Sequence, residues 1–144
     1  MAKVIRLKTD TLTPSLRRAV RGVRNRRPIL KAMADTTEQM AKRAFNVSSL
    51  RPKAWTPKKD GSPAKLFKTG SLKRSPRTTS VSNRRAFVGS DRGYAAIHQL
   101  GGVSRPMPAR PYFPFDARGK PTPKLKRNLN TVVRKKLNRQ IRKR

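Results

Sequence analysis

The sequence PTPKLKRNLNTVVRKKLNRQIRKR, residues 121–144, has the clearest helical periodicity in the chain and decides the class of fold. Thr122 stands where an N-cap is preferred, and Pro123 follows at the first helical position, where a missing N–H costs nothing. Apolar residues recur at i, i+4 and i+7/8, as on one buried helical face: Leu125, Leu129, Val132 with Val133, Leu137 and Ile141. The stretch predicts an amphipathic C-terminal helix of about twenty residues.

The N-terminal third predicts two further helices. Thr13 and Pro14 begin the first in the same way, and its apolar spacing predicts a helix over 14–24. After Pro28, the stretch PILKAMADTTEQMAKRAF, residues 28–45, predicts a second helix of four or five turns. Its apolar stripe consists of Ile29, Leu30, Met33, Thr37, Met40 and Ala44.

Residues 47–76 lose this periodicity and accumulate Pro, Gly, Ser and Lys, which predicts a long loop or arm anchored by Trp55 and the pair Leu66/Phe67. Residues 77–90 predict a hairpin with its turn near Asn83 and an apolar face from Val81, Phe87 and Val88.

Two short segments precede the C-terminal helix. YAAIHQL, residues 94–100, predicts two helical turns, with Gly101 adopting a positive φ after them. The four prolines of RPMPARPYFPFD, residues 105–116, predict extended chain that cannot be a central strand. The whole chain, 1–144, is predicted to be a single α+β domain: a small antiparallel sheet or hairpin packed with the N-terminal helices and the long C-terminal helix, plus the arm.

The charge of the chain restricts its neighbours. The 144 residues include 38 Lys and Arg against 6 Asp and Glu, a net charge of +32, and only 29 Leu, Ile, Val and Phe. Such self-repulsion destabilises a compact monomer and favours contact with a polyanion, either nucleic acid or an acidic protein surface. Cysteine is absent, which excludes disulfides and thiolate metal sites.

No segment predicts secretion or membrane insertion. The first residues, MAKVIRLKTDTLTPSLRR, have apolar residues only singly or in pairs between charges, unlike a signal peptide. No window approaches the roughly eighteen apolar residues of a transmembrane helix. We therefore expect no membrane partner.

The residues that build enzyme active sites are scarce. The chain has one histidine and six acids: Asp10, Asp35, Glu38, Asp60, Asp91 and Asp116. Only Asp35 and Glu38 lie one helical turn apart, and nearby Lys and Arg favour surface ion pairs there over a catalytic carboxylate pair. GSLKRS lacks the spacing of a phosphate-binding loop. We expect no enzymatic activity, no cofactor and no metal.

The lone histidine, His98, has three interpretations: catalytic base, metal ligand or structural residue. A zinc site without Cys or a second His would need carboxylates, and catalysis would need a nucleophile and an orienting group that the sequence does not offer. The favoured interpretation is a histidine that satisfies a backbone carbonyl or bonds to a neighbouring chain.

The C-terminal segment after Asp116 contains twelve basic residues and no acid. This exceeds what the helix dipole requires and predicts phosphate or carboxylate contacts without base specificity. Aromatic residues do not alternate with the basic ones, which disfavours a stacking platform for single strands. The candidate polyanion contacts are Lys124, Lys126, Arg127, Arg134, Lys135, Lys136, Arg139, Arg142, Lys143 and Arg144.

Four segments in order, AWTPKKDG, KLFKTGSLKRS, VGSDRGYAAIHQLGG and MPARPYFPFD, resemble the phage virion morphogenesis, or tail completion, proteins over about residues 55–115. That family has a Trp-containing loop, L-x-x-T-G-x-L, Y-A-x-I-H-Q-x-G and P-A-R-P-[FY] motifs, and a C-terminal helix. The acidic P-D-G-x-x-W approach to the tryptophan appears here as RPKAW. The matching positions are Trp55; Leu66, Thr69, Gly70 and Leu72; Tyr94, Ala95, Ile97, His98, Gln99 and Gly101; Pro108, Ala109, Arg110 and Pro111.

The resemblance implies a small α+β protein of the phage neck or tail end, without catalysis, whose motif residues serve structure or subunit interfaces. It implies a ring, sixfold by analogy with tail symmetry, that completes the tail and joins it to the head after assembly in the host cytoplasm. The implied partners are further copies of the chain, neighbouring neck, tail terminator or head–tail adaptor proteins, and non-specifically bound channel DNA. The alternatives are a basic nucleic-acid-binding protein of ribosomal or chromatin type and a metal- or His-dependent enzyme.

Overall fold

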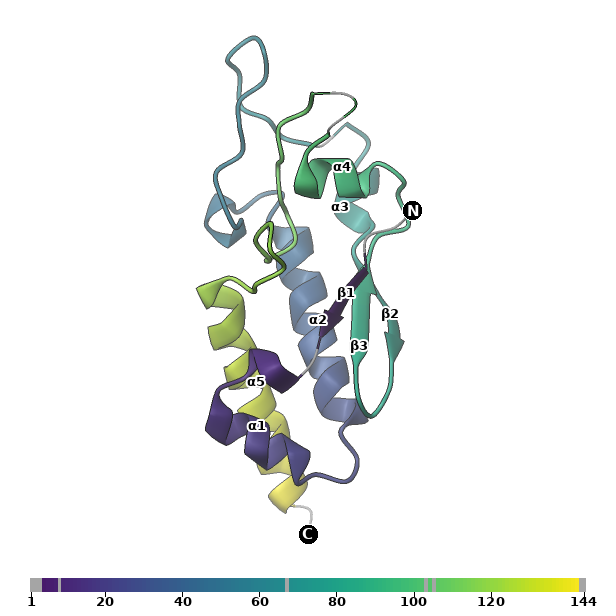
Figure 1. The fold of residues 1–144 in the computed structure, drawn as a ribbon, viewed down its shortest axis with the longest axis vertical. Helices are drawn as coiled ribbons and strands as arrows, with labels where there is room; N and C mark the ends of the chain where they lie inside the picture. The colour runs from purple at the N-terminus through teal and green to yellow at the C-terminus, as the bar shows by residue number, and fades with distance from the viewer. Residues whose placement is uncertain (1–3, 8, 67, 103, 105, 143–144) are drawn as a thin grey trace.

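The computed structural model describes residues 4–7, 9–66, 68–102, 104 and 106–142. It is elongated, with helices along one side and a small sheet along the other (Figure 1). Two 3-10 turns, Thr9–Thr11 and Ser48–Leu50, supplement the regular elements. Those elements are β1 (Val4–Leu7), α1 (Pro14–Arg21), α2 (Arg27–Arg43), α3 (Ser71–Arg74), β2 (Arg77–Val81), β3 (Ala86–Gly89), α4 (Ala95–Leu100) and α5 (Pro123–Arg142).

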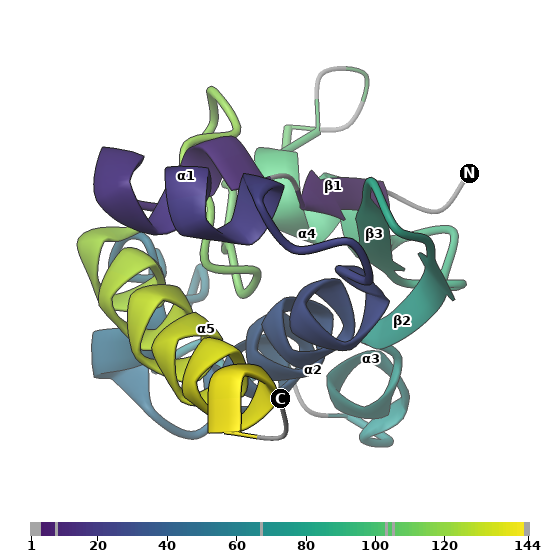
Figure 2. The same cartoon turned by 90° about the horizontal axis from the view of Figure 1, so that it is seen from below.

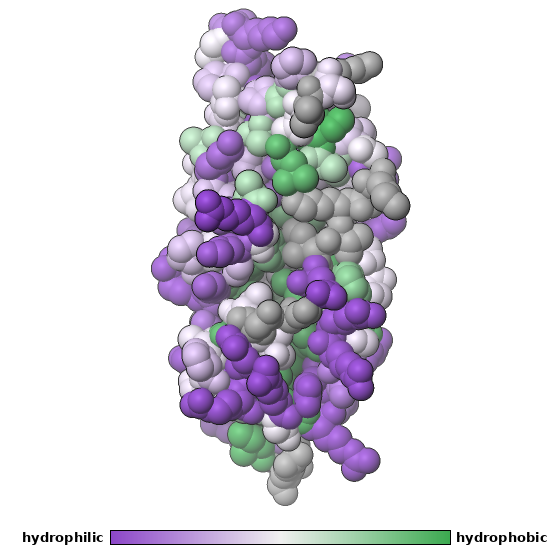
Figure 3. Space-filling model, viewed as in Figure 1, coloured by the Kyte–Doolittle hydropathy of each residue, from purple (hydrophilic) through white to green (hydrophobic). Residues whose placement is uncertain are grey.

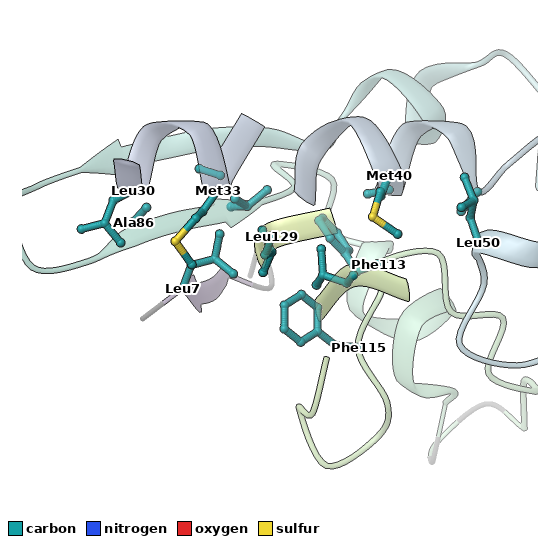
Figure 4. Close-up of a cluster of buried hydrophobic side chains, with 14 of the residues drawn as sticks. Leu7, Leu30, Met33, Met40, Leu50, Ala86, Phe113, Phe115 and Leu129 are labelled. Atoms are coloured by element: carbon teal, nitrogen blue, oxygen red, sulfur yellow. The ribbon is translucent and has the colours of Figure 1, made fainter. Parts of the chain in front are cut away.

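Helix α2 is the centre of the molecule. It packs against α5 on one side and against β2 and β3 on the other, an arrangement seen end-on in Figure 2. Leu30 and Met33 meet Leu7 and Ala86 of the sheet, while Leu129 of α5 lies farther along, among aromatic rings (Figure 4). All six residues of the predicted α2 stripe are buried, so that prediction is confirmed.

The sheet has three antiparallel strands in the order β1-β3-β2. The predicted hairpin is confirmed, with Val81 paired to Ala86 and an irregularity in the register between Thr78 and Ser80. The first strand was not predicted. It is only four residues long and pairs with β3, far away in sequence, so no local turn signal marks it.

The apolar face of the hairpin differs from the prediction at Phe87. Successive strand residues point to opposite faces, so Ala86 and Val88 share the face toward α2 and are fully buried. Phe87 lies on the other face, half-buried, with the Arg85 guanidinium 5.4 Å from its ring centroid. Val81, as predicted, packs against the core.

The boundaries of the terminal helices show where burial ends. Helix α1 stops at Arg21 and not at residue 24, with Gly22 as its C-cap. Helix α5 begins as predicted, with the Leu125 amide donating to the Thr122 hydroxyl at 3.2 Å. The prediction for Ile141 was wrong: it is 69% exposed, because the end of α5 reaches past α2 (Figure 1).

The predicted arm, residues 47–76, is irregular apart from the Ser48–Leu50 turn and α3. Trp55 is a buried anchor in it, as expected, with its ring edge-on to Phe45 at 5.8 Å. Leu66 is half-buried against the core, and Phe67 lies outside the described residues.

The two acids of α2 form separate ion pairs, as predicted, and no carboxylate pair. Asp35 bonds Lys31 at 2.8 Å, and Glu38 bonds Lys42 at 2.7 Å. Glu38 also accepts the backbone N–H of Thr78 at 2.9 Å and so ties β2 to α2. Burial opposes ionisation of Glu38, but the bonds from Lys42 and Thr78 outweigh it and lower its pKa.

No helix among the described residues is long and apolar enough to cross a bilayer.

Leu129→Ala should lower the free energy of unfolding by about 2–5 kcal/mol, because it removes a fully buried side chain between α5 and α2. Ile141→Ala, on the same helix but exposed, should change it by less than about 0.5 kcal/mol. Denaturant unfolding of both variants measures the difference. Similar losses for the two would contradict the assigned boundary of the core.

Candidate functional site

The segments that carry the family motifs lie at the end of the molecule opposite the α5 C-terminus, around α4 and α3 (Figure 1). Arg110, in the segment MPARPYFPFD, connects two of the others, α4 and the loop that contains Trp55. Its backbone N–H donates to the His98 carbonyl at 2.7 Å, and its Nε and Nη2 donate to the carbonyls of Thr56 and Pro57 at 2.8 and 3.1 Å. Arg110 therefore fixes α4 and the Trp55 loop to one strip of extended chain.

Gln99 holds the strip from the inside. Its Oε1 accepts the N–H groups of Tyr112 and Phe113, both at 3.0 Å, and its Nε2 donates to the carbonyls of Phe113 and Phe115 at 3.3 and 3.4 Å. The side chain is buried. Proline-rich chain cannot form a ladder with a neighbouring strand, so one buried amide supplies partners that a strand would otherwise provide.

Gly101 makes the close approach of α4 and this strip sterically possible. Its φ is 84°, which confirms the predicted positive value. A Cβ at this position would lie 3.1 Å from the Met107 carbonyl oxygen and 3.3 Å from the Ala109 nitrogen. Glycine avoids both the backbone strain and the contact.

Trp55 connects the proline-rich strip to the C-terminal end of α2. Its Nε1 donates to the Pro111 carbonyl at 2.8 Å, and the Arg51 guanidinium lies 3.6 Å from its ring centroid. Arg51 also caps α2 by donating to the carbonyls of Ala44 and Phe45. In the stretch RPKAW, Arg51 therefore links the α2 C-terminus to Trp55 by a cation–π contact.

The TG segment forms a tight turn into α3. Gly70 has a φ of 74° in the left-handed region, and the Ser71 N–H donates to the Thr69 hydroxyl at 3.3 Å. Leu72 is buried behind it. Beyond α3, the buried hydroxyls of Ser75 and Ser90 are 2.7 Å apart and join this turn to the end of β3.

A groove of about 600 Å³ opens between these segments, and we call it the motif groove. It is lined on one side by residues 64–66 and 68–72 and on the other by Tyr94 and His98, with Arg110 and Lys58 completing the wall. Three motifs that are separate in sequence contribute to it: Leu66, Thr69, Gly70 and Leu72; Tyr94 and His98; and Arg110.

His98 lines the groove, and its side chain does not show the predicted bond to a backbone carbonyl among the described residues. Its backbone carbonyl accepts from Arg110, yet its side-chain Nδ1 is buried without a hydrogen-bond partner among the described residues. Tyr94 packs edge-on to its ring at 6.0 Å. Burial and the nearby Arg110 charge lower the pKa of His98, so it is neutral near pH 7. No bond from the His98 side chain to a backbone carbonyl is seen among the described residues, whereas Gln99 forms such bonds; the alternative, a bond to a neighbouring chain, stays a prediction.

The other motif positions lie around the groove. Ala95, the first residue of α4, is buried. Pro111, whose carbonyl accepts from Trp55, is buried as well, and Pro108 is exposed. Ile97 is 38% exposed and points away from the core, beside Tyr94 at 44% and Leu100 at 49%. We call these three residues the α4 face; apolar surface gathers in the upper half of Figure 3, where α4 lies in Figure 1.

The predicted polyanion contacts lie on α5, far from the groove. Lys126, Arg127, Arg134, Lys135, Arg139 and Arg142 are exposed, Lys124 and Lys136 are half-buried, and Lys143 and Arg144 lie outside the described residues. None of the described α5 cations forms an ion pair with a described carboxylate. Hydrophilic side chains cover this lower half of the molecule in Figure 3.

Sequence reasoning missed two sets of residues. The rings of Tyr112, Phe113 and Phe115 are buried in the core, and burial raises the pKa of the Tyr112 phenol. Lys58, Lys65 and Lys68 line the motif groove. The PYFPF spacing signals buried aromatics, but nothing distinguishes these lysines from the many others. Among the described residues, no three His, Cys, Asp or Glu side chains gather as a metal site.

Gln99→Leu should lower the free energy of unfolding by about 3 kcal/mol or more, because it strands the buried N–H groups of Tyr112 and Phe113 and each costs about 1–3 kcal/mol. Gln39→Leu, on the exposed side of α2, should change it by less than about 0.5 kcal/mol. Denaturant titration compares the two.

Gln99→Glu sharpens this test. The glutamate keeps one acceptor for Tyr112 and Phe113 but turns a second oxygen toward the carbonyls of Phe113 and Phe115, so folding favours its protonated form. Its folded-state pKa is then above the unfolded value, and the stability lost at pH 7 should be partly regained as the pH falls through that raised pKa. A loss independent of pH would contradict the assigned bonds.

Comparison with known proteins is consistent with this assembly of motifs. The chain is 34% identical over 106 residues, 70% of this chain and 75% of the relative, to the Mu-like prophage FluMu G protein 2 of Haemophilus influenzae. No solved structure matches it. The sequence profile of the phage virion morphogenesis family matches residues 7–137, nearly the whole described structure. The chain therefore belongs to the phage virion morphogenesis family.

Proposed function

We propose that this chain is a structural subunit of the phage neck or tail end, without catalytic activity, which forms a ring that completes the tail and joins it to the head. The observation that carries the proposal is the α4 face. Ile97 and Leu100 of the six-residue helix α4, with its N-cap Tyr94, expose large apolar side chains, and Gln99 fixes the opposite side of the helix.

The α4 face is suited to a protein interface. Exposed apolar area gains roughly 25 cal/mol per Å² when it is removed from water, and a rigid helix loses little entropy on docking. Tyr94 and Ile97 are also positions of the family motif, while Leu100 lies one turn beyond Ile97. In the proposed ring this face contacts a different surface of the next copy. Such a head-to-tail contact forms a closed ring when the rotation between neighbouring copies is a whole fraction of 360°.

A sixfold ring of this chain would concentrate its positive charge. Each subunit carries +32, so self-association needs counter-charge from outside the ring. DNA in the channel, bound non-specifically, would provide it, as would acidic neighbours among the neck, tail terminator or head–tail adaptor proteins. The ring would assemble in the host cytoplasm and remain in the virion at the neck or tail end.

The engaged carboxylates support the absence of catalysis. Asp35 and Glu38 pair with lysines, and Asp91 contacts Arg77 at 3.2 Å. The groove histidine shares its lining with the hydroxyls of Thr69 and Ser71, but none of the described lining residues is a carboxylate that could orient the imidazole. A general acid–base mechanism requires such partners within hydrogen-bond reach.

Ile97→Asp should abolish self-association and incorporation into virions, because it places a charge in the centre of the α4 face. The change should leave the unfolding free energy within about 0.5 kcal/mol of the parent value, since the side chain is partly exposed. Native mass spectrometry and electron microscopy of particles measure the two effects. Ile141→Asp is the control, an exposed isoleucine on α5 with the same charge change; equal behaviour of the two variants would refute the proposal.

The exposed cations of α5 favour a second candidate, a basic protein whose main task is to neutralise nucleic-acid phosphates. A helix face without ion pairs to described carboxylates is a suitable phosphate-binding surface, and such contacts carry no sequence information. In this reading the duplex is the principal partner and no virion protein is needed.

Replacing both Arg134 and Arg139 by glutamine tests whether α5 meets DNA. Each lost phosphate contact should reduce the slope of log affinity against log salt by about 0.9, so the double variant should lose about two units with any duplex sequence. Lys65→Gln with Lys68→Gln, on the motif groove, is the matched control and should keep the slope. An unchanged slope in the α5 variant would exclude this helix as the DNA contact.

A further inference from the structure

The charged side chains that line the motif groove are all positive among the described residues. Lys58, Lys65, Lys68 and Arg110 face it, and none of its described lining residues is acidic. The Ser62 hydrogen bonds and the charge of nearby Lys58 lower the pKa of Asp60, so it is a carboxylate near the groove, but it is not one of the lining residues. Four cations at one groove attract an anionic occupant and disfavour a cationic one.

One cation of the groove, Arg110, is positioned before any ligand arrives. The Arg110 guanidinium is held by bonds from Nε and Nη2 to two backbone carbonyls. His98 also lines the groove, but its Nδ1 is itself buried. Because the Arg110 guanidinium is already fixed, an anion that binds it loses little free energy to side-chain ordering.

The groove is also partly apolar. Leu66 and Leu72 line it beside the Tyr94 ring. Its volume of about 600 Å³ is typical of pockets that enclose a small ligand or a few side chains. A purely ionic occupant would leave this apolar surface uncovered, so the fitting ligand combines negative charge with a bulky apolar group.

A second copy of this chain does not supply such a ligand from its described residues. The acids whose side chains the structure describes are all engaged within their own chain. Their partners are Lys31 for Asp35, Lys42 and Thr78 for Glu38, Ser62 for Asp60, Arg77 and Arg92 for Asp91, and the N–H groups of Arg118 and Lys120 for Asp116.

We propose that the motif groove is a docking site for an extended acidic segment of a different protein, with carboxylates on the lysines and Arg110 and one apolar side chain against Leu66, Leu72 and Tyr94. Nucleic acid fits less well, because single-strand sites stack successive bases on several aromatic rings and Tyr94 is the only described ring of that size here. In the proposed ring the segment belongs to a neighbouring virion protein, although binding to the groove does not require the ring.

The test uses the full-length protein and a fluorescently labelled peptide of Glu and Asp residues with one central Phe, followed by anisotropy at physiological salt. Lys65→Glu with Lys68→Glu should weaken binding about tenfold or more, as expected when charged hydrogen bonds are lost. Arg134→Glu with Lys135→Glu changes the net charge equally on α5 and should weaken binding less than about threefold. All four side chains are exposed, so both variants should fold.

Two further arms identify the occupant. Replacing the peptide Phe by Ser should weaken binding several-fold if the apolar wall is used. A labelled DNA duplex should be insensitive to the groove variant. Equal losses for the two charge-reversed variants would show general attraction only and overturn the proposal, as would a groove variant that weakens the duplex as much as the peptide.

Ile97→Asp separates this proposal from the ring. If the groove acts independently, Ile97→Asp should bind the peptide with parent affinity even where it no longer self-associates. Loss of peptide binding in Ile97→Asp, with the fold intact by circular dichroism, would overturn the independence of the groove. Retained self-association in the Lys65/Lys68 variant, with loss of the peptide, would support the groove while leaving the ring to its own test.

Discussion

The side-chain amide of Gln99 connects the motif groove to the hydrophobic core. It bonds to the backbone of Tyr112, Phe113 and Phe115, and so turns a proline-rich strip that cannot join a sheet into a fixed part of the core. The aromatic rings of the strip then point inward toward α2 and α5, as Figure 4 shows for Phe113 and Phe115. Because the same amide lies on α4, the helix that bears the exposed apolar face is fixed by the bonds that secure the core.

The chain uses its few acids for structure. Glu38 ties β2 to α2, and Asp116 accepts the N–H groups of Arg118 and Lys120 in the turn that precedes α5. The cations outnumber them so greatly that most remain without a carboxylate. Self-repulsion of this size opposes compaction, and an external polyanion or acidic protein reduces it. The fold and its partners are therefore linked energetically: binding counter-charge stabilises the folded state by mass action.

Three surfaces divide the molecule according to their chemistry. The α4 face is apolar, the motif groove is basic with an apolar wall, and the outer side of α5 is basic and lies at the opposite end (Figures 1 and 3). Self-association, capture of an acidic segment and contact with DNA make different physical demands. Tyr94 belongs to both the α4 face and the motif groove, but the other residues of each surface can be substituted without altering the other two.

Local periodicity in the sequence was enough to predict α2, α5 and the hairpin, because the burial of each depends on spacing within one short segment. The same reasoning placed Ile141 in the core and Phe87 on its face, since spacing does not report where a neighbouring helix ends or which side of a strand meets it. It gave no signal for β1, whose partner strand is far away along the chain.

The motifs were recognisable as separate stretches of sequence, and the positive φ of Gly101 followed from its place directly after α4. Only the tertiary structure decided that the Gln99 side chain bonds to its own backbone, that the buried Nδ1 of His98 has no partner among the described residues, and that three motifs and scattered lysines line one groove. The physical reason is that a groove is made by side chains brought together through long-range packing, whereas the sequence specifies directly only what lies within a few turns of each residue.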